Sequence, residues 1–323
     1  MFNKIFCLEI LNKLGNLHRN LMSSLEKIIN TFTTNKDIYE FINNYINNNN
    51  LSKAFPIGIS INQVVAHDSF HEFNLIKLNK GDYIKIDVGL IESGNIIDCA
   101  RTFVYNSEKT ERINNSKIIC ETVENFIRNQ IKLYGKIQIQ KISEFINALI
   151  ISHDYNNLNF LGGHTIEFGK VHGKHVILNK PLKILPKEAV KFIDSNAEIG
   201  DEEMFAIEIY IPENNTPGDI IKSITIPITH YQINLEEIPY IKLKENEKNI
   251  LSQITKLTDN LVYEYFIHEN FDSHIIRNLI EKNAIIKHNA IEFKCNNSKN
   301  KIKYIQYEDC FLIRDKQLFN LSK

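Results

Sequence analysis

The stretch KIDVGLIESGNIIDCARTF, residues 85–103, holds two runs rich in β-branched side chains on either side of Ser93-Gly94. Apolar and polar residues alternate over residues 82–88, which is the period of a strand with one buried face. A Ser-Gly pair between two such runs is typical of a tight turn. We therefore predict an antiparallel hairpin in which residues 82–88 return as residues 96–105.

The register of this hairpin places two acids together. Opposed residues around a two-residue turn at 93 and 94 have index numbers that sum to 187, so Asp98 faces Gly89. Asp87 shares a face with Gly89, which makes the two carboxylates diagonal neighbours with Cα atoms about 7 to 8 Å apart. Such a pair can bracket two metal ions that lie about 3.5 to 4 Å apart. The alternative is a pair of acids on a solvent-facing strand.

Helical spacing precedes the hairpin. Apolar residues recur at steps of three and four over residues 10–28, which predicts a helix. A second helix is expected to begin near Thr34, with Asp37 completing a capping box, and to end at the Asn run of residues 47–50.

The chain after the hairpin mixes both periods. Residues 113–152 are expected to be mainly helical, and residues 205–211 and 301–313 to be strands. Between these strands, helical spacing appears at Ile250, Ile254, Leu257, Leu261 and Tyr265. We predict one α+β domain over residues 1–323 with a helical insertion subdomain at about 235–295.

Composition excludes several classes of protein. The 323 residues are 43% hydrophobic and carry a net charge of −1, which supports a packed core and argues against a general nucleic-acid binder. No apolar run is long enough to span a bilayer, and charges come too early in the first ten residues for a signal peptide. Five scattered Cys fit a reducing compartment. We expect a cytoplasmic monomer without membrane or nucleic-acid contacts.

Four acids lie inside strongly apolar strand segments, namely Asp87, Asp98, Glu208 and Glu308. Burying an unpaired carboxylate is costly, and such a group tends to stay protonated. The sequence shows no matching set of buried Arg or Lys. Metal ions are therefore the expected source of positive charge.

Five spaced motifs stand out in the sequence, namely AFPIGISINQVVAH (54–67), KIDVGLIESGNIIDCARTF (85–103), GGHTIEFGKVHGK (162–174), AIE (206–208) and QYED (306–309). Together they resemble the methionine aminopeptidases, in particular their type 2 branch. Glu208 and Glu308 lie 100 residues apart, as the insertion of type 2 enzymes requires. The resemblance covers most of the chain.

The resemblance implies a pita-bread fold, in which two pseudo-symmetric halves of curved antiparallel sheet are backed by helices and enclose a metal site. It implies that Asp87 binds one metal with both oxygens, that Asp98 and Glu308 bridge two metals, and that His164 and Glu208 complete the ligands of the second metal. Oxygen-rich ligation with one imidazole suits two divalent ions among Co, Mn, Fe and Zn.

The resemblance also implies catalytic and substrate-binding residues. Glu208 would be the general base, and His67 and His172 would face the substrate. Phe55, Val171 and His230 would line the pocket for the methionine side chain. His153, His175, His268, His274 and His288 match no role and are expected to be structural or solvated.

The chain departs from the family pattern at Asp68, Arg101 and Asp309, which leaves pocket shape and metal tuning open. The implied activity is removal of the initiator methionine from nascent proteins and peptides with a small second residue, in the vicinity of the ribosome. Two alternatives remain: a non-catalytic relative that binds RNA or protein, and an Xaa-Pro peptidase of the same fold. Retained ligands argue against the first, and the short segment before His67 argues against the second.

Overall fold

Two antiparallel helices form the N-terminal part of the protein. The structure, a computed structural model, describes residues 5–181, 194, 196–216, 218–295 and 302–323. Helix α1 (Leu8–Ile28) is followed by η1 (Ile29–Thr31) and α2 (Asn35–Asn48). Thr34 and Asp37 form the capping box that the sequence predicts, and the helix ends within the Asn run. Both helices are therefore confirmed.

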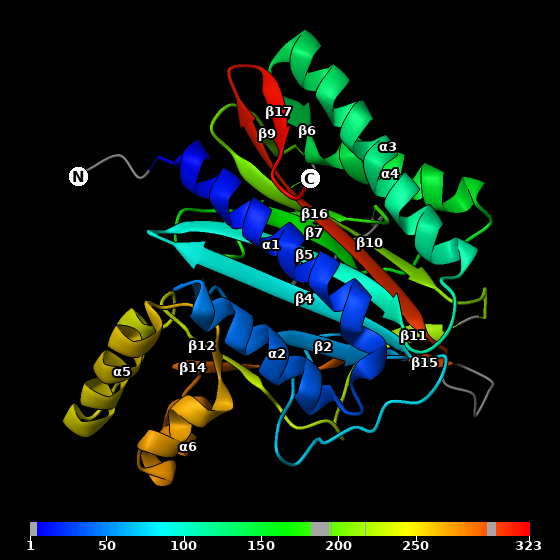
Figure 1. The fold of residues 1–323 in the computed structure, drawn as a ribbon. Helices are drawn as coiled ribbons and strands as arrows, with labels where there is room; N and C mark the ends of the chain where they lie inside the picture. Colours follow the sequence, from blue (N-terminus) through cyan, green and yellow to red (C-terminus); the bar gives the residue numbers. More distant parts are fainter. Residues whose placement is uncertain (1–4, 182–193, 195, 217, 296–301) are drawn as a thin grey trace.

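The predicted hairpin forms the centre of the first half-sheet, which we define as strands β1 (Ser52–Lys53), β2 (Gly58–Ile61), β4 (Tyr83–Glu92) and β5 (Asn95–Val104). Ser93 and Gly94 make the turn. Alternate residues of β4 (Ile84, Ile86 and Val88) enter an apolar core with α1 and α2, and α1 lies across β4 and β5 (Figure 1). The short strand β3 (Val64–Ala66) follows β2.

The second half-sheet has the strand order β17-β16-β10-β7-β8. Its strands are β7 (Gly162–Ile166), β8 (Val176–Leu178), β10 (Met204–Pro212), β16 (Tyr304–Arg314) and β17 (Gln317–Asn320). Residue 301, where the sequence predicts the last strand to start, lies outside the described residues. The prediction that this strand is the final one is wrong, because the chain turns at Asp315 and Lys316, both with positive φ, and pairs again as β17.

Two helices cover the outer face of the second half-sheet (Figure 1). They are α3 (Glu111–Tyr134) and α4 (Ile139–Ser152), separated by Gly135 in the left-handed region and by β6 (Ile137–Gln138), which pairs with β9 (Glu198–Ile199). The mainly helical stretch predicted for residues 113–152 is thus confirmed, with a break at a glycine that can adopt a φ of +75°.

The two half-sheets meet where β5 lies beside β16, a junction that we call the seam. In the described strands, β5 and β16 belong to different hydrogen-bonded sheets. Side chains join them instead: the Thr102 hydroxyl donates to the carbonyl of Gln306 at 2.8 Å and accepts from the Gln306 amide at 2.9 Å. Lys85 reaches across to the carbonyl of Tyr304 at 3.2 Å.

The region of the predicted insertion contains strands as well as helices. Its elements, with the two strands before it, are β11 (Gly218–Lys222), β12 (His230–Ile233), η2 (Ile238–Tyr240), α5 (Glu245–Thr258), β13 (Tyr263–Glu264), η3 (Tyr265–Asn270), α6 (Ser273–Glu281), β14 (Ile285–His288) and β15 (Ile291–Cys295). Helix α5 stops before Leu261 because Asp259 and Asn260 adopt positive φ. An apolar cluster of its own packs α5 and α6 against β12 and β14. A separate subdomain remains a prediction.

Candidate metal centre

The first half-sheet supplies two carboxylates in the predicted register. Gly89 is paired with Asp98, and Asp87 lies two residues away on the same strand, so both side chains line one cavity. A Cβ atom on Gly89 would lie only 2.2 Å from the ring of Phe55. Glycine at this position therefore lets Phe55 lie against the acids.

The second half-sheet supplies three more side chains. Glu208 of β10 is paired directly with Glu308 of β16, and His164 of β7 is paired with Ala206. Because Ala206 and Glu208 differ by two positions, His164 lies on the same face as both glutamates. All three side chains line the cavity that Asp87 and Asp98 enter from the other side of the seam.

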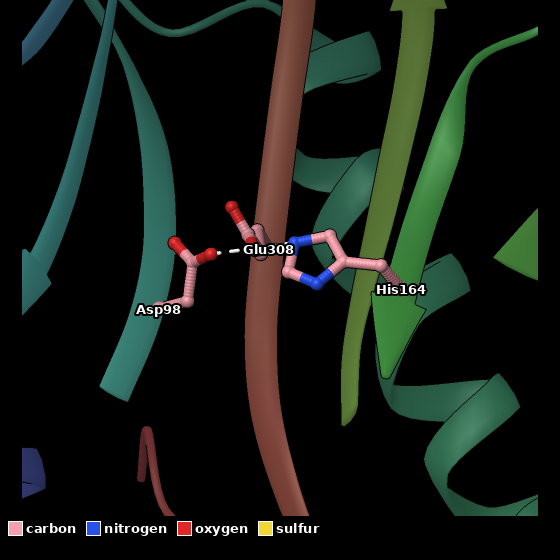
Figure 2. A group of neighbouring side chains, drawn as sticks. All are labelled: Asp98, His164 and Glu308. Atoms are coloured by element: carbon pink, nitrogen blue, oxygen red, sulfur yellow. Dashed lines mark ion pairs between the residues drawn. The ribbon is translucent and has the colours of Figure 1, made fainter. Parts of the chain in front are cut away.

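The side chains of Asp98, His164 and Glu308 come from three different strands and point toward one another (Figure 2). Each offers a ligand atom, and these atoms all lie within 4.8 Å of one another. Nε2 of His164 is 3.4 Å from Oδ2 of Asp98 and 3.6 Å from Oε1 of Glu208. The enclosed space is about 60 Å³, which suits small ions and water rather than a large cofactor.

Burial and the repulsion of neighbouring acids raise the pKa of three carboxyl groups, those of Asp87, Glu208 and Glu308. Burial, followed by the charges of Asp98 and Glu208, raises the pKa of Asp87 well above its usual value. Burial and the same neighbours do so for Glu308, and burial raises the pKa of Glu208 to about 7. Burial would lower the pKa of His164, but its contact with Asp98 outweighs this and raises it. Among the described residues, no Lys or Arg side chain lines the cavity, so His164 is the cationic partner nearest to these acids.

Three buried oxygens of the group have no hydrogen-bond partner among the described residues, namely Oδ1 of Asp87, Oδ1 of Asp98 and Oε1 of Glu308. Contrary to expectation, two basic side chains, Lys85 and Arg101, do lie nearby, but each is bonded to groups outside the cavity. Lys85 donates to backbone carbonyls, and Arg101 pairs with Asp309 at 2.6 Å. Unpartnered carboxylate oxygens beside an imidazole are the donor set that divalent transition metals require, so the residues fit such ions.

The histidines predicted to face the substrate gather around the same cavity. His67, His172 and His230 all line it, and the His172 ring lies 4.6 Å from that of His164. His67 has a φ of +60°, a conformation that is costly for a non-glycine residue and that is often found at functional sites. Phe55 also lines the cavity. Val171 lies instead in the apolar core with α1, outside the residues that line the cavity.

Sequence reasoning missed several residues that line the cavity, among them Tyr210, Gln306, His288 and Val262. Tyr210 donates a 2.6 Å hydrogen bond to Oε2 of Glu208, and Gln306 donates to Oδ2 of Asp87 at 3.2 Å. Both lie two positions from a predicted ligand on the same strand face, a signal that was available. His288 and Val262 also line the cavity. His288, expected to be structural or solvated, lies at the cavity because β14 pairs it with His230 across strands distant in sequence.

The departure at Asp68 lies behind the cavity. Burial raises the pKa of Asp68 to about 7, while the Ser69 amide and the Asn74 side chain donate hydrogen bonds to it. It is absent from the residues that line the cavity and so does not alter the shape of the cavity directly.

A wider groove of about 820 Å³ opens from the cavity. The two share seven residues, namely Ala66, His67, His164, His172, Glu208, Tyr210 and His288. The groove continues along residues 167–170 and 232–236. An extended chain could therefore lie in the groove with one end at the carboxylates.

The sequence model of metallopeptidase family M24 matches residues 9–241 of this chain. The chain belongs to this family. Similar proteins include a methionine aminopeptidase of Thermococcus onnurineus, 31% identical over 51% of this chain and 54% of the relative. Another, of Saccharolobus solfataricus, is 26% identical over 77% of each chain. The chain spans about half the length of the first of these relatives.

Solved structures show the fold. The methionine aminopeptidase of Rickettsia prowazekii superposes with a TM-score of 0.61 at 16% identity, covering 99% of both chains. A prolidase of Pyrococcus horikoshii OT3 gives a TM-score of 0.56 at 13% identity over 99% of this chain and 63% of the prolidase. The pita-bread fold predicted from the resemblance is confirmed. Such distant likenesses do not distinguish one activity from another.

Proposed function

We propose that this M24 family member is a metal-dependent methionine aminopeptidase of the type 2 branch. The observation that carries the proposal is the convergence of Asp87, Asp98, His164, Glu208 and Glu308 on one cavity, with buried oxygens unpartnered. Two divalent ions held there would supply an activated water and polarise the scissile carbonyl. Their number and identity, among Co, Mn, Fe and Zn, are part of the proposal.

The side chains around the ions have distinct roles in this mechanism. Glu208 accepts the proton of the attacking water and passes it to the leaving amine, and Tyr210 holds its carboxylate in place. His172 donates a hydrogen bond to the carbonyl oxygen as negative charge develops. His67 lies near the scissile amide.

The methionine side chain would lie against Phe55, Val262 and His230, which all line the cavity. The rest of the peptide would extend into the wider groove. A closed pocket for the first residue and an open groove for the following ones favour an exopeptidase over a peptidase that cuts within a chain. A small second residue is expected in the substrate.

The setting of this activity is part of the same proposal. We propose a cytoplasmic monomer that acts on the N-termini of nascent proteins, close to the ribosome, without binding a membrane or nucleic acid. Its nearly balanced charge supports this. No helix in the described part of the chain is long and apolar enough to cross a bilayer. Light scattering and ribosome co-sedimentation test these points.

The decisive experiment compares purified variants on the peptide Met-Ala-Ser after loading with Co²⁺ or Mn²⁺. Glu208→Gln and His164→Ala are each expected to lower kcat/KM at least about a thousandfold, since one removes the base and the other a ligand. Glu213→Gln, at a partly exposed glutamate paired with Lys303, serves as the control and should retain activity.

The alternatives give different results. An Xaa-Pro peptide cleaved faster than Met-Ala-Ser would assign the prolidase activity instead. Wild-type protein that binds no metal would indicate a non-catalytic scaffold. Near-normal turnover in Glu208→Gln would refute the mechanism.

A further inference from the structure

Two of the departures from the family pattern, Arg101 and Asp309, contact each other across the seam. Nη2 of Arg101 lies 2.6 Å from Oδ1 of Asp309. The carboxylate is fully buried, and its second oxygen accepts a 3.3 Å hydrogen bond from Asn320. The guanidinium also lies 4.1 Å from the centre of the Tyr307 ring. The two unusual residues are thus one ion pair, with a buried carboxylate and a partly exposed guanidinium.

The same guanidinium is bonded to the backbone of both strands that carry the bridging carboxylates. Nη1 of Arg101 donates to the carbonyl of Ala100, two residues from Asp98 on β5, and to the carbonyl of Glu308 itself on β16. The side chains of Asp98 and Glu308 point to the cavity, whereas those of Arg101 and Asp309 lie on the opposite face of their strands. The pair therefore braces the metal-binding face from behind.

This brace matters because β5 and β16 belong to separate ladders in the described strands. A backbone ladder fixes strand separation through repeated hydrogen bonds. Here the separation depends on a few side chains, and near Glu308 the guanidinium takes the place of ladder hydrogen bonds. An Arg fork holds its partners in a fixed plane, which a flexible ammonium does not.

We propose that Arg101 and Asp309 are a positioning pair that sets the separation of Asp98 and Glu308 and thereby the affinity of the metal position they share with His164. The inference rests on the proposed metal function, but it concerns binding and not cleavage. Changes to residues behind metal ligands commonly alter metal affinity about 10- to 100-fold.

The test titrates metal-free protein with Co²⁺ alone, by calorimetry and by the visible absorption of the bound ion. Arg101→Met and Asp309→Asn are each expected to weaken binding at least about tenfold and to alter the Co²⁺ spectrum. Each single change strands a buried charge, so the double variant should recover part of the affinity. Arg101→Lys, which keeps the charge but loses the fork, should be intermediate.

Arg128→Met is the matched control. Arg128 also pairs with a glutamate, Glu124 at 2.6 Å, and donates to a backbone carbonyl, but it lies on α3 away from the cavity. The Arg128→Met variant should have a lower melting temperature and an unchanged affinity for Co²⁺. The proposal is overturned if Arg101→Lys or Asp309→Asn lowers the melting temperature but keeps wild-type Co²⁺ affinity and spectrum. Wild-type protein that binds Co²⁺ but leaves Met-Ala-Ser intact would instead refute the peptidase assignment alone.

Discussion

The two half-sheets bring their ligands to the cavity by different routes. In the first, Asp87 and Asp98 are placed by one hairpin, whose two-residue turn fixes the register between residues close in sequence. In the second, Glu208 and Glu308 are directly paired although 100 positions separate them. Local geometry thus sets one side of the site, and long-range strand pairing sets the other.

The largest effects are expected from removing one proposed metal ligand from each half. Asp98→Asn and Glu308→Gln should each lower Co²⁺ affinity at least about a hundredfold, because each deletes a charged ligand oxygen. If both acids serve one site, the double variant should lose little more than either single variant. Calorimetric titration measures this. Fully additive losses would mean that the halves bind metal independently.

Smaller effects are expected from replacing one glycine in each half-sheet by alanine, and the two changes should differ in how they affect metal binding. A Cβ atom on Gly163 would lie 2.0 Å from the carbonyl oxygen of Ala206, so Gly163→Ala must push β7 away from β10 beside His164. We expect a loss of about 3 kcal/mol in the free energy of unfolding, the upper range for overpacking, together with weaker metal binding.

Gly94→Ala is the counterpart in the hairpin turn. There the new Cβ meets the Phe168 ring, a side chain that can move, and the φ of +79° adds strain. A loss of about 1 to 2 kcal/mol is expected, with metal affinity retained because the register of the hairpin survives. Urea denaturation with parallel Co²⁺ titration distinguishes the two variants. Equal losses of metal affinity would contradict the comparison.

The smallest effect concerns hydrogen bonds to the acids. Tyr210 lowers the pKa of Glu208, and Gln306 lowers that of Asp87 across the seam. Removing either donor in Tyr210→Phe or Gln306→Leu should raise the pKa of its carboxyl group, so fewer carboxylates are ionised at a given pH. Metal affinity near neutral pH should fall about tenfold, and the pH at which half the metal binds should rise. An unchanged pH midpoint would show that these bonds do not tune the ligands.

The contrast also explains which features were predictable from the sequence. The face shared by Asp87 and Asp98 follows from strand period and turn length alone, and the structure has the predicted pairing of Gly89 with Asp98. The burial of Glu208 and Glu308 follows from their apolar neighbours. Their direct pairing does not, since no local rule fixes the register of strands so far apart.

Residues brought in by long-range pairing escaped prediction for the same reason. His288 reaches the cavity because β14 pairs with β12, and Val171 is directed into the core instead. The pairing of Arg101 with Asp309 was equally hidden, because each residue alone only looked like a departure from a motif. Tyr210 and Gln306 could have been found by extending each ligand's strand face by two positions.

The seam has a consequence for how the protein accumulates in a cell. Carboxyl groups from the two half-sheets face each other across a junction held by side chains, so an ion that bound only the folded chain would shift the folding equilibrium toward the folded state. Metal supply would then influence how much intact protein is present, in addition to any effect on activity.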